Sequence, residues 1–274
     1  MATTELIQLV VLLAAAGVAA GVLAGLLGVG GGIVLVPVLD LAFGAAGVPE
    51  SVRMHLAVGT SLASIVPTAL SSARAHWRRG GIDTSVALSW SPAIAVGASL
   101  GAWLASRVGG GVLSMVFAVV ALAAGLRMIL GVDVSAEGRD RGAARPRWWP
   151  LPVLIGTVSS MMGIGGGTLS VPALSALGLS VHRAVGTSAW LGLWIALPAA
   201  LGFAWLGQGS AGLPPLSLGH VNLLALAVLL PATVLAAPLG AKVAHSLTRR
   251  QLAVAFGVFL LISALRMFYR AATG

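Results

Sequence analysis

The residues best placed to do chemistry in this 274-residue chain are two similar glycine-rich stretches. The sequence GVGGGIVLVPVL occupies residues 28–39, and GIGGGTLSVPAL occupies residues 163–174. Glycines at this density cannot sustain a helix, since each costs about 1 kcal/mol relative to alanine, and the following proline removes an amide hydrogen. We therefore predict that a helix stops, turns and restarts at each stretch. The first residues of the restarted half-helix would present free N–H groups and a partial positive charge to an anion.

Two other roles for the glycines are close helix packing and nucleotide binding. Glycines in membrane helices can serve close packing alone. A P-loop needs Lys followed by Ser or Thr, and a dinucleotide-binding turn needs an acid about 20 residues further on. Neither context follows these glycines, which argues against a nucleotide site.

A second motif follows each glycine stretch, HLAVGTSL at residues 55–62 and HRAVGTSA at residues 182–189. Its hydroxyl groups could donate to an oxyanion or bond back to a helix carbonyl one turn earlier. The histidine that opens each motif, His55 or His182, could lie at the membrane interface or sense pH. Arg74 could neutralise an anion, although extending its charge toward the interface is the alternative.

Acidic and catalytic residues are scarce. None of the seven acids falls centrally in a predicted membrane span, and only Asp40 is a candidate, with Ser175 at the corresponding position of the second stretch. Cation pathways and proton relays usually place carboxylates in the membrane, so the sequence favours an anion. There is no cysteine, no HExxH motif and no pair of carboxylates. We therefore predict no catalysis, no metal site and no cofactor.

The composition predicts the elements that must position these motifs. Hydrophobic residues make up 58% of the chain, charged residues only 8%, and the mean hydropathy is +1.01. Soluble domains carry about 25% charged residues, so we predict an all-α, polytopic membrane protein. The apolar segments that could span a bilayer are 55–73, 86–106, 111–130, 184–206, 220–241 and 251–268. The net charge of +9 comes mostly from arginines that flank these spans, as expected at a membrane surface, and we predict no nucleic-acid binding.

The chain reads as a tandem duplication. Pro92 and Gly101 recur 139 positions later as Pro231 and Gly240, and Phe117 recurs as Phe256. We predict two homologous membrane modules, residues 1–131 and 148–274, joined by an exposed basic loop at 132–147. Each module would hold one glycine-broken re-entrant segment and three transmembrane helices.

The distribution of basic residues favours inverted modules. If each glycine-rich region is a hairpin that returns to its own side, the 16 basic residues divide 12 to 4 between the two sides of the membrane. If each region crosses once, the modules are parallel and the division is 10 to 6. Basic residues gather on the cytoplasmic side, so the first arrangement is favoured. The ridge of Gly17, Gly21 and Gly25 could serve packing within the chain or in a homodimer.

At these motifs the sequence resembles the sulfite exporter TauE/SafE family of membrane permeases. The resemblance rests on the doubled GxGGGxxxxP and HxAVGTS elements and covers nearly the whole chain. It implies an inner-membrane protein of two similar modules that moves sulfur-containing anions, mostly outward. It also implies that the following residues line the pathway: Gly30, Gly31, Gly32, Pro37, Thr60, Ser61, Gly165, Gly166, Gly167, Pro172, Thr187 and Ser188. Arg183 replaces the Leu56 of the first motif and adds a positive charge at one entrance.

We therefore expect a secondary transporter of small sulfur anions such as sulfite, sulfoacetate or other organosulfonates, working by alternating access in the bacterial inner membrane. Two alternatives stay open at this point. One is a membrane scaffold or biogenesis partner that transports nothing, and the other is a permease of the same build for another anion or for uptake. The partners expected are the anion and the lipid bilayer.

Overall fold

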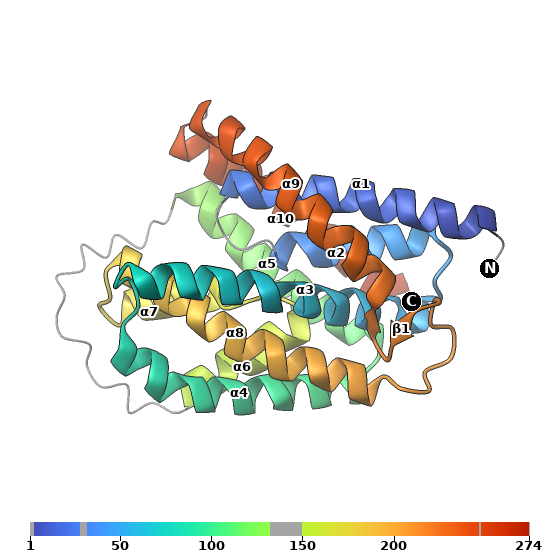
Figure 1. The fold of residues 1–274 in the computed structure, drawn as a ribbon, viewed down its shortest axis with the longest axis horizontal. Helices are drawn as coiled ribbons and strands as arrows, with labels where there is room; N and C mark the ends of the chain where they lie inside the picture. The colour runs from blue at the N-terminus through green and yellow to red at the C-terminus, as the bar shows by residue number, and fades with distance from the viewer. Residues whose placement is uncertain (1–2, 28–31, 132–149, 247, 274) are drawn as a thin grey trace.

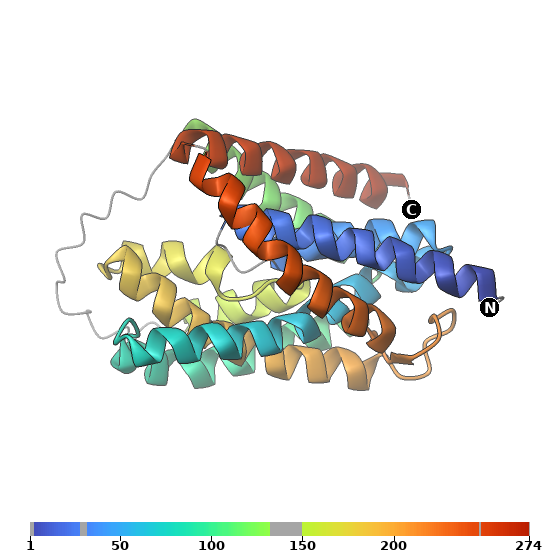
Figure 2. The same ribbon diagram turned by 45° about the horizontal axis from the view of Figure 1, so that its top comes forward.

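The computed structural model describes residues 3–27, 32–131, 150–246 and 248–273, and nearly all of them are helical (Figures 1 and 2). The first half contains α1 (Thr3–Leu27), α2 (Gly32–Ala45), α3 (Glu50–Arg78), α4 (Thr84–Arg107) and α5 (Gly110–Leu130). The second half contains α6 (Pro150–Met162), α7 (Gly167–Ala176), α8 (Val181–Leu206), β1 (Ser217–Leu218), β2 (Val221–Asn222), α9 (Leu223–Ser246) and α10 (Arg249–Thr273).

Within the described residues, five helices are long and apolar enough to cross a membrane, namely α3, α4, α5, α8 and α10. They coincide with five of the six spans expected from hydropathy, and the sixth expected span, 220–241, overlaps α9. Large apolar side chains are exposed on these helices, among them Leu88, Leu201 and Ile262. Such side chains suit contact with lipid rather than water. The prediction of an all-α polytopic membrane protein is confirmed.

The predicted helix break is seen in full in the second glycine stretch. Helix α6 ends at Met162 and α7 begins at Gly167, and Gly163 has a φ of +70° that favours glycine. In the first stretch α1 ends at Leu27 and α2 begins at Gly32. The predicted site residues Gly30 and Gly31 lie outside the described residues. Both short helices, α2 and α7, are about 21 and 15 Å long at 1.5 Å per residue, too short for a hydrocarbon core of about 30 Å.

Each glycine stretch joins the two arms of a hairpin. Helix α2 runs back toward the end of the molecule at which α1 begins, and α7 runs back toward the end at which α6 begins (Figure 1). Pro37 and Pro172 are each the sixth residue of the returning helix, where a proline lacks the N–H that would close the first turns.

Helices in corresponding places of the two halves run antiparallel to each other. A Cβ on Gly125 of α5 would lie 2.9 Å from the carbonyl oxygen of Gly257 in α10, whereas Gly131 beyond the end of α5 faces Arg250 at the start of α10. Helices α3 and α8 are likewise antiparallel, because Gly59 faces Phe203 and His76 faces Gly186. Antiparallel partners are what inverted modules require. The module boundaries themselves stay a prediction.

Two glycines of the predicted ridge pack against α9 of the same chain. A Cβ on Gly17 would lie 2.7 Å from Cβ of Ala232, and one on Gly21 would lie 2.6 Å from the carbonyl oxygen of Thr233. At these two positions the small residues therefore serve close helix contact within the chain.

Candidate functional site

The two helix breaks lie against each other inside the molecule. A Cβ on Gly32, the first residue of α2, would be 3.2 Å from the backbone nitrogen of Gly165 and 3.2 Å from Cα of Ile164. The start of one half-helix therefore touches the segment that precedes the other. The first N–H groups of an α-helix lack partners within the helix and carry the positive end of its dipole, so two helix starts at one junction would suit an anion.

Ile65 of α3 covers this junction. Its Cδ1 atom would lie 2.8 Å from a Cβ on Gly32, and its Cγ2 atom 3.3 Å from a Cβ on Gly165. Ile65 is buried together with Ala69 and Ala196 in a small apolar cluster, against which Leu193 packs. These side chains form an apolar cover over the junction.

The serines predicted to line the pathway lie at the second break. The hydroxyl of Ser61 donates to the carbonyl oxygen of Gly163 over 2.7 Å. Ser188 donates to the carbonyl of Val185 one turn earlier, which is one of the two roles that the sequence leaves open for this hydroxyl. The carbonyl of Ser188 faces Gly166 closely enough to exclude any side chain there.

Two further serines beside the break have unused hydroxyl groups. Ser159 near the end of α6 and Ser170 in the first turn of α7 are fully buried. Neither hydroxyl has a hydrogen-bond partner within the described part of the chain. A buried polar group without a partner is costly, which makes both hydroxyls candidate donors to a polar ligand at the break.

The threonines of the repeated motif hold the starts of two long helices. The hydroxyl of Thr60 accepts a hydrogen bond from the backbone N–H of Asn222 (3.0 Å), and that of Thr187 accepts one from Asp83 (2.9 Å). Asn222 and Asp83 lie 139 positions apart, the spacing of the repeated landmarks. Each caps the first turn of its own helix, since its side-chain oxygen accepts the N–H of Ala225 or Val86. A role of these threonines in lining the pathway stays a prediction.

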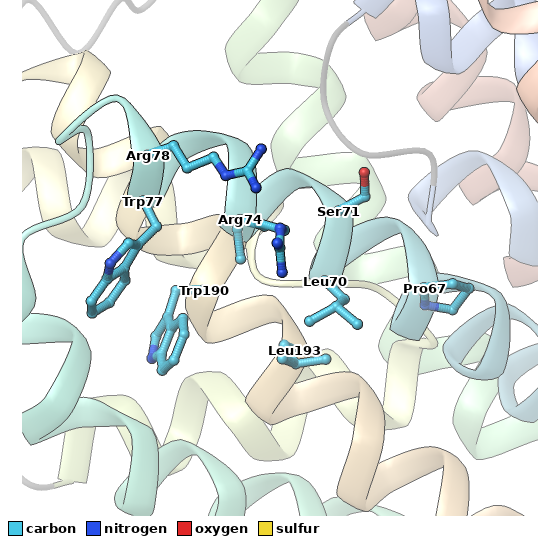
Figure 3. Close-up of a pocket in the computed structure, with 9 residues that line it drawn as sticks. Pro67, Leu70, Ser71, Arg74, Trp77, Arg78, Trp190 and Leu193 are labelled. Atoms are coloured by element: carbon cyan, nitrogen blue, oxygen red, sulfur yellow. The ribbon is translucent and has the colours of Figure 1, made fainter.

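A pocket of about 640 Å³ opens between the last turns of α3 and the middle of α8. Arg74 and Leu70 extend from α3 toward Trp190 and Leu193 of α8, and Trp77 lies beside Trp190 (Figure 3). The two indole rings are 5.3 Å apart between centroids, and Trp190 donates its N–H to the hydroxyl of Ser91. The remaining lining residues are Pro67, Ser71, Ala73 and Arg78. Leu193 lines this pocket and also packs on the apolar cluster of Ile65. The pocket therefore lies next to the side chains that cover the junction.

The other charged candidates lie away from the junction. His182 is exposed, and Arg183 pairs with Asp83 at 3.3 Å. His55 is buried, and its Nε2 atom lies 3.0 Å from the carbonyl oxygen of Ala105 and 3.1 Å from that of Val108. Its ring is 5.0 Å from that of His220, which precedes α9.

The pair of His55 and His220 predicts a pH-dependent stability. Burial, and then the nearby charge of His55, lowers the pKa of His220 from 6.5 to about 4. Between pH 6.5 and pH 4, His220 is mostly protonated in the unfolded chain and mostly neutral in the folded chain. The free energy of unfolding should therefore fall by about 3 kcal/mol as pH drops from 6.5 to 4.

Thermal unfolding at pH 7 and pH 4.5 measures this loss, and His220→Gln should weaken the pH dependence. The exposed His182 provides the control His182→Gln, which should behave as wild type. If the stability of His220→Gln and that of His182→Gln depend equally on pH, His220 is not the group responsible.

The residues at the junction differ in the signal that they carry in the sequence. Ile65 is one apolar residue among many in a span, and only the fold brings it to both breaks. Ser159 and Ser170 were missed although they flank the glycines in SSMMGIGGGTLS. Hydroxyls that close to a predicted break were a usable signal.

Comparison with known proteins identifies the family. The family model described as "Sulfite exporter TauE/SafE" matches residues 13–267. The chain belongs to the sulfite exporter TauE/SafE family. Among curated proteins, a probable membrane transporter protein of Haemophilus influenzae is 32% identical to this TauE/SafE chain over 93% of it and 96% of the relative. The probable membrane transporter protein YunE of Bacillus subtilis is 24% identical over 94% and 97%. No solved structure matches the chain significantly.

These matches and the apolar helices make the TauE/SafE chain a multi-pass membrane transporter. The expectation drawn from the glycine and HxAVGTS motifs is confirmed at the level of family and class. The names of the relatives specify no anion.

Proposed function

We propose that this chain is a secondary transporter, working as an exporter, of small sulfur-containing anions such as sulfite, sulfoacetate or other organosulfonates across the bacterial inner membrane. The contact between Gly32 and the backbone nitrogen of Gly165 is the observation that carries the proposal. It brings two half-helix starts to one place, and interrupted helices of this kind form substrate sites in transporters.

The chemistry around the junction supports a negative solute. Backbone N–H groups at helix starts and the hydroxyls of Ser159 and Ser170 can donate hydrogen bonds to an oxyanion. Arg74 and Arg78 line the pocket on the far side of the apolar cover, where their charge would draw anions toward the site. Movement of Ile65 away from Gly32 and Gly165 would join the pocket to the junction.

Flux into proteoliposomes tests the proposal. Purified protein should accelerate uptake of ³⁵S-sulfite into vesicles, with saturation, and unlabelled sulfoacetate should compete if organosulfonates share the site. The comparison is with vesicles that lack the protein. Sulfur-anion flux no faster than in empty vesicles, together with a protein that co-purifies, would favour the scaffold alternative.

A further inference from the structure

Asp40 is fully buried near the end of α2, yet it lies among three arginines. Its Oδ1 atom is 3.3 Å from Nε of Arg53 and also contacts Nη1 of Arg270, and its Oδ2 atom is 3.2 Å from Nη2 of Arg266. Glu50 adds a second carboxylate, 2.7 Å from Nε of Arg270. We call these five residues the Asp40 cluster.

The cluster contains more positive than negative charge. Three guanidinium groups face two carboxylates, and the arginine side chains are only 11–35% exposed. The side chain of Glu50 is 55% exposed, so its charge is well screened by water. Asp40 is therefore the main partner of three partly buried cations. Buried charges that lose their partner are strongly unfavourable.

The cluster lies at one end of α3, and among the described residues the corresponding position of the second half does not offer a carboxylate. It ties α2 and the start of α3 to the end of α10, far along the chain. In the second glycine stretch the position of Asp40 is taken by Ser175, 135 residues later, which cannot ionise. The pocket of Arg74 and Trp190 opens at the opposite half of α3. The cluster is thus not required by the repeated architecture.

Guanidinium groups bind sulfite, sulfonate and sulfate through the same charge-assisted N–H···O bonds that they make with a carboxylate. We propose that Arg53, Arg266 and Arg270 form a second oxyanion site, at this end of the pathway, which Asp40 occupies until a transported anion displaces it. The proposal rests on the proposed function, because the displacing anion is the one that arrives from the junction of the breaks. An anion that binds the open cluster more tightly than the closed one shifts the population toward opening.

Removing the carboxylate should make the site available to added anions. In Asp40→Ala, sodium sulfite should raise Tm by about 5 °C more than it does in the wild type, because the anion binds the folded state only. Sodium chloride of the same ionic strength gives the baseline. Ser175→Ala, at the corresponding position of the other half, is the matched control and should respond as wild type. If Asp40→Ala does not fold, Asp40→Asn removes the charge at nearly constant size and serves the same test.

A double variant shows where the anion binds. The extra response to sulfite should disappear in Asp40→Ala combined with Arg270→Gln. An extra response that persists in the double variant, or one that is absent from both Asp40 variants, would overturn the proposal. The readout is binding alone, so an extra sulfite response in Asp40→Ala that Arg270→Gln removes, together with a wild type that carries no flux, would contradict the proposed function and leave this site standing.

Discussion

Replacing Gly165 by leucine is expected to abolish anion flux while the protein remains folded. Within the described residues, a Cβ at this position meets Ile65, at 3.3 Å from its Cγ2 atom, so that side chain must shift by a few tenths of an ångström. The remaining carbons would occupy the space between the start of α2 and the second break. Loss of two hydrogen bonds to a charged ligand, about 1.5 kcal/mol each, corresponds to roughly 100-fold weaker binding. Sulfite flux in proteoliposomes measures the effect, and Gly165→Ala should retain much of the activity.

Gly111 provides the control for this substitution. It lies in the first turn of α5 with open space around an added Cβ, and Gly111→Leu should transport as wild type. Normal flux in Gly165→Leu would remove the break from the pathway.

Substitutions at the glycines of the repeated HxAVGTS motif should give large losses of stability. An added Cβ on Gly59 would overlap the carbonyl oxygen of His220, and one on Gly186 would overlap that of Gly81. These obstacles are backbone atoms, which cannot rotate away as a flexible side chain could. Gly59→Ala and Gly186→Ala should each lower the free energy of unfolding by about 3 kcal/mol.

Thermal unfolding in detergent measures this loss, with Gly111→Ala as the reference. That reference should stay within about 0.5 kcal/mol of the wild type. If both motif variants unfold at the wild-type temperature, the close contacts of Gly59 in α3 with His220 and of Gly186 in α8 with Gly81 are wrong.

Much of the fold follows from features that the chain displays locally. The absence of charge over long segments predicts spans, since a charged side chain in lipid is costly, and five of those spans appear as α3, α4, α5, α8 and α10. Glycine density predicts a break before residue 167, because no helix tolerates it, and α7 begins there. The expectation that Gly165, Gly166 and Gly167 belong to a broken segment therefore has a local cause.

Contacts between distant segments could not be predicted in the same way. Neither glycine stretch encodes the position of the other, and the contact of Gly32 with Gly165 depends on how all the spans pack. The same holds for Asp40, whose partners Arg266 and Arg270 lie 226 and 230 residues away. The motif threonines show a further limit. A hydroxyl in a membrane helix suits a ligand and a backbone amide equally, and only the fold shows that Thr60 and Thr187 hold the starts of α9 and α4.

Equilibrium binding of ³⁵S-sulfite to the purified protein tests most directly whether the two breaks form one anion site. The wild type should bind sulfite saturably, and unlabelled sulfoacetate or thiosulfate should compete for the same site. Gly165→Leu should bind sulfite at the junction roughly 100-fold more weakly, while its unfolding temperature stays that of the wild type. Sulfite binding of equal affinity and stoichiometry in the two proteins would contradict the account.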